Sequence, residues 1–160
     1  MDIATLLSTD RIIFTNEVSS TKRAFELLSE RLCHDLHVSE LSVDIVFDAI
    51  VAREKLGSTA LGNGIAIPHA CTEIKEPRAA LLVLQEGLSM DTPDKKPVHM
   101  LLSLLVPETD RSSYRPLLSE LTGSINRQDI VQQIVQYQDA RLTLELLSSL
   151  FATDFREMAA

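Results

Sequence analysis

An arginine, a loop of hydroxyls and glycines, and a histidine fall close together between residues 53 and 69. The residues of this stretch that could do chemistry are Arg53, Ser58, Thr59, Gly62, Gly64 and His69. Arginine presents a rigid, always charged fork of donors to phosphate oxygens. Glycines let backbone N–H groups converge on one anion, and hydroxyls add further donors. A neutral imidazole is a nucleophile near neutral pH. Together these groups could accept and hold a phosphoryl group.

Each feature also has a structural explanation. Arg53 could lay its stem along the edge of the core and leave its head in water. Glycine and hydroxyl clusters usually make turns, and a single histidine is more often a surface residue. The loop does not fit a nucleotide site: Asn63 stands where a Walker loop needs lysine, and Ile67 stands where G-x-G-x-x-G needs a third glycine. The sequence therefore favours neither ATP nor NAD, and no cofactor is predicted.

The elements before this stretch are predicted to be one short strand and two helices. Residues 12–14 favour the strand, and the four-residue spacing of apolar side chains predicts a helix from Ser20 to about Asp35. Ser42 suits the N-cap of a second helix, which Gly57 would end. Arg53 continues the apolar stripe of that second helix, so we expect its head at the rim of a sheet.

Largely apolar runs follow, at residues 64–67, 79–84 and 98–106. Such runs are typical of strands buried on both faces of a sheet. His69 is expected at the end of the first strand, where ligand-binding groups gather in α/β sheets. From Ser112 onward the spacing of leucine and isoleucine is helical. Strands between helices predict a three-layer α/β/α domain, and 160 residues suit a single domain over 1–160.

Composition excludes several function classes. The net charge is −8, whereas binding to a nucleic-acid backbone would need a basic stripe. The N-terminus lacks the pattern of a signal peptide, and the apolar runs are shorter than the roughly 20 residues that span a bilayer. Two cysteines without motif spacing favour the reducing cytoplasm. Cys33, His34 and His37 could be read as a metal cluster, but no second ligand group stands at zinc-like spacing, so no metal is predicted.

The glycine and histidine stretch closely resembles the signature of the enzyme IIA family of the mannitol/fructose type. These are phosphocarrier domains of the bacterial phosphoenolpyruvate phosphotransferase system. The resemblance lies in residues 53–59 and 62–69. Three other stretches resemble the nitrogen-regulatory branch of that family: residues 6–13, 20–28 and 104–107.

The resemblance implies a mixed sheet between helices and a role for each site residue. His69 would accept the phosphoryl group through Nε2, Arg53 would stabilise it, and Ser58 and Thr59 would shape the pocket. The donor would be an HPr-like phosphocarrier (NPr), charged in turn by an enzyme I–type protein. The chain would be a stoichiometric, regulatory carrier rather than a turnover enzyme. The alternative within the family is a sugar-system component that passes the phosphoryl group to a IIB domain.

One departure concerns a second histidine that family members often carry after the last strand. Tyr114 stands there, and it brings no positive charge at neutral pH, which leaves Arg115 as a substitute. Two other function classes stay open. A hydrolase could use Ser58 or His69 as its nucleophile, although no nucleophile-elbow motif is present. A pure interaction module would use the loop only structurally, and His69 would then be replaceable.

Overall fold

The computed structural model describes residues 3–36, 41–109, 112 and 115–159. The N-terminal elements are α1 (Ile3–Leu6), the 3-10 helix η1 (Thr9–Arg11), β1 (Ile12–Thr15), α2 (Thr21–Cys33) and α3 (Val43–Lys55). The middle of the chain forms β2 (Ala60–Gly62), β3 (Ile65–Ala66), β4 (His69–Thr72), β5 (Arg78–Leu88) and β6 (Val98–Pro107). The C-terminal part forms α4 (Arg115–Ile125), α5 (Gln128–Tyr137) and α6 (Ala140–Ala159).

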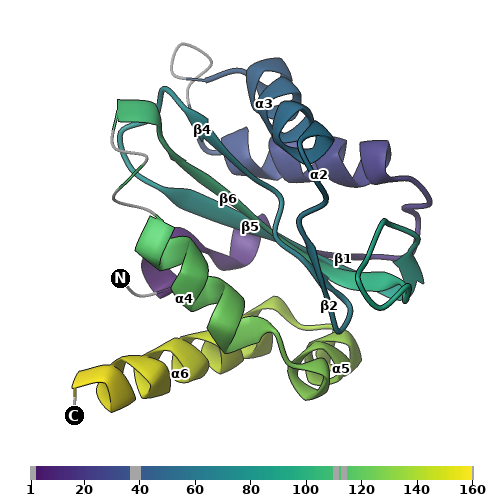
Figure 1. The fold of residues 1–160 in the computed structure, drawn as a ribbon, viewed down its shortest axis with the longest axis vertical. Coiled ribbons are helices and arrows are strands. Elements are labelled where there is room, and N and C mark those ends of the chain that lie inside the picture. Colours follow the sequence, from purple (N-terminus) through teal and green to yellow (C-terminus); the bar gives the residue numbers. More distant parts are fainter. Residues whose placement is uncertain (1–2, 37–40, 110–111, 113–114, 160) are drawn as a thin grey trace.

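The strands of the described residues form one mixed sheet, as predicted. Its order is β1-β5-β6-β3-β2, and β4 pairs with β6 beyond β3. Strand β1 runs parallel to β5, β3 and β4 run parallel to β6, and the β5–β6 and β2–β3 pairs are antiparallel. Helices α2 and α3 lie above the sheet in Figure 1, and α4, α5 and α6 lie below it. The predicted three-layer arrangement is therefore confirmed.

Two hydrophobic cores share this sheet. Leu81 and Leu102 belong to the core between the sheet and α1, α4, α5 and α6. Leu82 and Leu101 belong to the core between the sheet and α2 and α3. Successive residues of a strand point to opposite faces, so β5 and β6 must be apolar at nearly every position. This explains the continuous apolar runs of the sequence. No helix in the described part of the chain is both long and apolar enough to cross a membrane.

The helices begin where the sequence predicts. The Ser20 hydroxyl accepts a hydrogen bond from the Arg23 amide at the start of α2, and the Ser42 hydroxyl accepts one from the Ile45 amide at the start of α3. Each hydroxyl satisfies a backbone N–H group that the first turn leaves unpaired. Helix α3 ends at Lys55, two residues before Gly57. The serine cap and this end fix where α3 presents Arg53.

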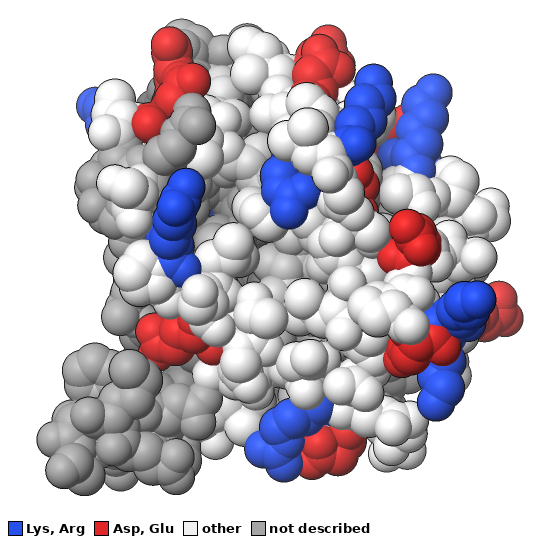
Figure 2. Space-filling model, viewed as in Figure 1, with Lys and Arg blue, Asp and Glu red and all other residues white. Residues whose placement is uncertain are grey.

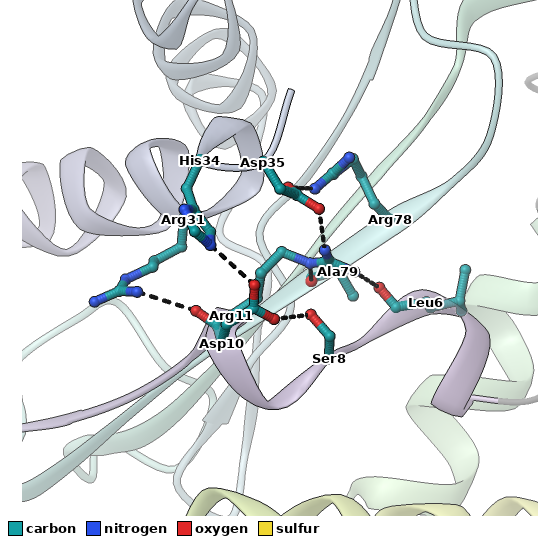
Figure 3. Close-up of polar contacts among 9 residues, drawn as sticks. All are labelled: Leu6, Ser8, Asp10, Arg11, Arg31, His34, Asp35, Arg78 and Ala79. Atoms are coloured by element: carbon teal, nitrogen blue, oxygen red, sulfur yellow. Dashed lines mark hydrogen bonds and ion pairs between the residues drawn. The ribbon is translucent and has the colours of Figure 1, made fainter. Parts of the chain in front are cut away.

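A buried arginine holds the N-terminal segment against the sheet (Figure 3). The Arg11 Nε donates to the Ala79 carbonyl at 2.9 Å, and its Nη2 donates to the Leu6 carbonyl at 3.0 Å. Its Nη1 lies 3.1 Å from the Asp35 carboxylate, which Arg78 of β5 also contacts. One carboxylate thus joins η1, the end of α2 and β5.

Candidate functional site

His69 lies beside a break in a strand. It begins β4 rather than ending a strand, which corrects the expectation from the sequence. Strands β3 and β4 pair with the same strand in the same direction, with Ala66 opposite Leu101 and His69 opposite Leu104. The Leu104 amide donates to the Pro68 carbonyl at 3.0 Å, so the pairing continues across the break. Proline has no N–H group to donate to the ladder, which accounts for the interruption before His69.

The His69 ring is held in one tautomer. Its Nδ1 lies 2.8 Å from the Ile67 carbonyl oxygen. A carbonyl can only accept, so Nδ1 carries the hydrogen and Nε2 keeps its lone pair. Burial has the largest effect and lowers the pKa of His69. The hydrogen bond to the Ile67 carbonyl raises this pKa by less, the charge of Arg53 lowers it by less again, and Glu54 has the smallest effect, which raises it. The ring is therefore neutral at neutral pH, with Nε2 as its nucleophilic atom.

A cavity of about 600 Å³ surrounds this ring. It is lined by Ala49, Ala52, Arg53 and Leu56 of α3, by His69, Ala70 and Cys71 of β4, by Leu104 and Val106 of β6, and by Arg115 and Leu118 of α4. The walls are mostly apolar, and the charged groups among the lining residues are the two guanidinium groups. The structure thus brings Arg53 and His69 together, as the sequence predicts.

The Arg53 guanidinium is fixed at the wall of the cavity. Its Nη1 donates to the Gly57 carbonyl at 3.0 Å, just beyond the end of α3. Arg53 and His69 line the same cavity, so both groups face one space. An anchored fork of this kind leaves further N–H groups for an anion in the cavity.

The hydroxyls of Ser58 and Thr59 are engaged in the loop itself. Both the Thr59 amide and its Oγ1 donate to the Glu54 carboxylate, at 3.1 and 2.7 Å. The Ser58 Oγ donates to the Asp91 carbonyl at 2.6 Å and accepts from the Ala60 amide. Neither residue is among those that line the His69 cavity. Their contacts tie the end of α3 to β2 and so position Arg53 from behind.

Gly62 and Gly64 form the turn of the β2–β3 hairpin, away from His69. The φ angles of Gly62, Asn63 and Gly64 are 88°, 56° and 83°, a run of left-handed backbone that favours glycine. The Asn63 amide donates to the Asp94 carboxylate at 3.0 Å. Gly64 and Asp94 line a separate cavity with His99. The turn does bind an anion, but that anion is a side chain of the same chain.

Two residues of the site carry little signal in the sequence. Glu54 holds Thr59 and acts electrostatically on His69, yet it reads as an ordinary surface residue of α3. Cys71 lines the cavity from the same strand as His69.

Tyr114 and His37 lie outside the described residues. His34 places its Nε2 2.9 Å from the Asp10 carboxylate, which gives that histidine a structural partner.

Comparison with known proteins agrees with this fold. The family model of the phosphoenolpyruvate-dependent sugar phosphotransferase system, EIIA 2, matches residues 5–150, so the chain belongs to this family of phosphotransferase components. A nitrogen regulatory protein of Pseudomonas aeruginosa is 35% identical over 126 residues, which cover 78% of this chain and 80% of that one. A fructose-specific EIIA component of Haloferax volcanii is 27% identical over 92% of this chain and 95% of its own.

A solved structure gives the same result. The nitrogen regulatory protein IIA-Ntr of Neisseria meningitidis superposes with a TM-score of 0.81 at 35% identity, covering 91% of this chain and 98% of that one. The resemblance to the nitrogen-regulatory branch, inferred from the sequence, is confirmed.

Proposed function

We propose that this chain is a phosphocarrier of the nitrogen-related phosphotransferase system, with Nε2 of His69 as the phosphoryl acceptor. The observation that carries the proposal is the His69 ring itself: a neutral imidazole with Nδ1 committed to the Ile67 carbonyl and Nε2 left free, in one cavity with Arg53. The names of the Pseudomonas and Neisseria relatives support the regulatory branch. A cytoplasmic location and an HPr-like donor (NPr) belong to the same proposal.

The transfer step balances on these atoms. The Nε2 lone pair of His69 attacks the phosphorus of the donor's phosphohistidine, and the donor's N–P bond breaks with its electron pair returning to the donor ring. The His69 ring gains positive character as the new N–P bond forms, and the Nδ1–H bond to Ile67 disperses that charge. Arg53 stabilises the equatorial oxygens as the group passes. Ser58 and Thr59 act indirectly, by holding the end of α3.

The test is phosphorylation from phosphoenolpyruvate by enzyme I and the HPr-like donor, followed by intact mass. Wild type should gain one phosphoryl group, and His69→Ala should gain none while keeping its fold. His34→Ala is the matched control, since His34 is exposed and contacts Asp10, and it should be phosphorylated normally. The label should be lost in acid and kept in base, as for a phosphoramidate. Acid-stable, base-labile label would reject His69 as the acceptor.

The second candidate is a sugar-system IIA component, which the name of the Haloferax relative favours. The two candidates differ in what happens next to the phosphoryl group. Phosphorylated protein mixed with a purified fructose- or mannitol-type IIB domain should keep its label if it is a regulator. Rapid loss of the label to the IIB domain would support the sugar-transport role instead.

A further inference from the structure

Arg115 lines the same cavity as His69 and Arg53, but it comes from the other side of the sheet. Arg53 lies on α3, which covers one face, and Arg115 is the first residue of α4, which lies against the other face (Figure 1). Strand β4, which carries His69, pairs with β6 and packs against α3. The two guanidinium groups therefore approach the cavity from opposite layers of the fold.

Arg115 also differs from the other arginines whose side chains the structure describes. Each of those hydrogen bonds to, or forms an ion pair with, a carboxylate or a backbone carbonyl: Arg11, Arg23, Arg31, Arg53, Arg78, Arg127 and Arg141. Within the described part of the chain, Arg115 contacts no carboxylate within ion-pair distance. It is exposed at the mouth of a cavity that has apolar walls and no carboxylate among its lining residues. A cation in that setting lacks a counter-ion, and an anion inside the cavity would supply one.

We propose that Arg115 is a second phosphoryl-binding residue, which closes on the phosphoryl group of His69 from the side opposite Arg53. This inference rests on the proposed function. The phosphoryl group brings up to two negative charges into a cavity whose cationic groups are Arg53 and Arg115. Both guanidinium groups stay charged across the physiological range. The stabilisation that they give to the phosphorylated form therefore does not titrate near neutral pH.

The measured quantity is the equilibrium of phosphoryl transfer between the donor protein and this chain, from about pH 5.5 to 8. Arg115→Gln should lower that equilibrium constant by about tenfold, the effect of losing a charge-assisted contact at a partly exposed site. Arg115→Lys keeps the charge and should recover part of the loss. Arg141→Gln is the matched control, because Arg141 is an exposed arginine on α6 paired with Glu145, and it should leave the equilibrium unchanged.

Two further readouts separate contact with the phosphoryl group from a role in folding. In the phosphorylated protein, the ³¹P resonance of Arg115→Gln should titrate at higher pH than that of wild type, because one cation that favours the dianion is gone. Arg115→His should make the transfer equilibrium pH-dependent, favouring the phosphorylated form more below about pH 6.5 than above it. Circular dichroism checks that each variant is folded.

The proposal is overturned if Arg115→Gln matches wild type in both the equilibrium and the ³¹P titration. In that case the proposed function still stands, because wild type carries its phosphoryl group on His69. If wild type accepts no phosphoryl group at all, the proposed function fails and the role of Arg115 fails with it. A loss in Arg115→Gln that Arg115→Lys and Arg115→His share equally at every pH would make Arg115 a structural residue, and would also reject the proposal.

Discussion

At the scale of single residues, the chemistry depends on which nitrogen of His69 carries the hydrogen. Nδ1 of His69 hydrogen bonds to the carbonyl of Ile67, which lies only two residues earlier in the chain. This hydrogen bond therefore does not depend on a distant element. A ring fixed in this way needs no proton transfer before it attacks phosphorus, because the lone pair on Nε2 is already free. Burial keeps the ring in this form by lowering its pKa.

The first prediction is that His69 titrates below the ordinary histidine pKa of about 6.5. Burial and the charge of Arg53 both disfavour the protonated ring, so Arg53→Gln should raise the titration midpoint without removing the whole shift. Proton and nitrogen NMR of the imidazole ring measures this directly. Because the folded pKa lies below the unfolded one, this group should reduce stability as the pH falls below about 6.5. A wild-type midpoint at or above 6.5 would contradict the neutral nucleophile.

The second prediction concerns the fork of Arg53. Arg53→Lys keeps the positive charge but loses the rigid pair of donors, so transfer to His69 should slow by about ten- to a thousandfold. The rate is measured by rapid mixing with phosphorylated donor, quenching at set times, and mass spectrometry of the phosphorylated protein. Arg141→Lys should transfer at the wild-type rate, since Arg141 is exposed on α6. If Arg53→Lys and Arg141→Lys transfer at equal rates, Arg53 does not act on the phosphoryl group and its side chain only covers the edge of the core.

At the scale of elements, the long buried strands, the capped helices and the short strands β1 and β3 could be predicted from the sequence, whereas β2 and β4 could not. Strand β4 has four residues with alternating exposure, and Pro68 separates it from the apolar run. No local pattern marks such a segment, because its place is decided by pairing with β6, in which His69 lies opposite Leu104, far along the chain. Strand β5 runs past the predicted end at Leu84. Exposed Gln85 and Glu86 break the apolar run, and after a register shift the pairing with β6 resumes at Leu88, opposite Val98.

The candidate site divides in the same way. Residue type alone indicates Arg53 and His69, whereas the role of Gly62 and Gly64 depends on where Asp94 lies, which the local sequence does not encode. The motif identifies the family correctly, although two of its glycines form a hairpin turn and do not line the His69 cavity. The sequence names Arg115 as a substitute for the second histidine of the family, and the fold then places it on the wall of the His69 cavity.

The third prediction compares two glycines. Gly87 in β5 has φ 79°, and a Cβ there would lie 3.0 Å from both the His99 ring and Pro97. Gly87→Ala should therefore lower the free energy of unfolding by about 1–3 kcal/mol. Gly123 in α4 has nothing within 4 Å of the same position, so Gly123→Ala should raise it by about 0.5–1 kcal/mol. Urea denaturation measures both, and a shift of the same sign in the two variants would be inconsistent with this account.

At the scale of the whole molecule, phosphoryl transfer needs a surface on which a donor protein can dock. Leu56 is 84% exposed and Ile45 is 57% exposed, although both are large apolar residues. With Ala49 and Ala52 they follow the four-, three- and four-residue spacing of one helical stripe along α3, which ends at the His69 cavity. Figure 2 shows basic and acidic side chains mixed around a largely uncharged centre on one face of the molecule. Such a surface suits contact with a protein better than with a polyanion.

The fourth prediction follows from that stripe. Leu56→Glu should reduce the second-order rate of phosphoryl transfer from the donor by roughly tenfold or more, because a charge would replace an apolar contact next to the cavity. The maximal rate at saturating donor should change much less, since the His69 ring is untouched. Leu142→Glu, at a 39% exposed leucine on α6, is the control and should leave both rates as in wild type. Equal effects of the two substitutions would argue that α3 is not the docking surface.

The way the strands pair also sets when the site can exist during synthesis. His69 is held by β6, and the cavity is completed by α4, so its walls come from residues 49 to 118. While the ribosome is still making β6, the nascent chain has the histidine but neither the strand that holds it nor the helix that closes it. Under the proposed function, a donor would therefore phosphorylate only chains that have finished folding. An incomplete or misfolded copy would then carry no phosphoryl group and give no signal.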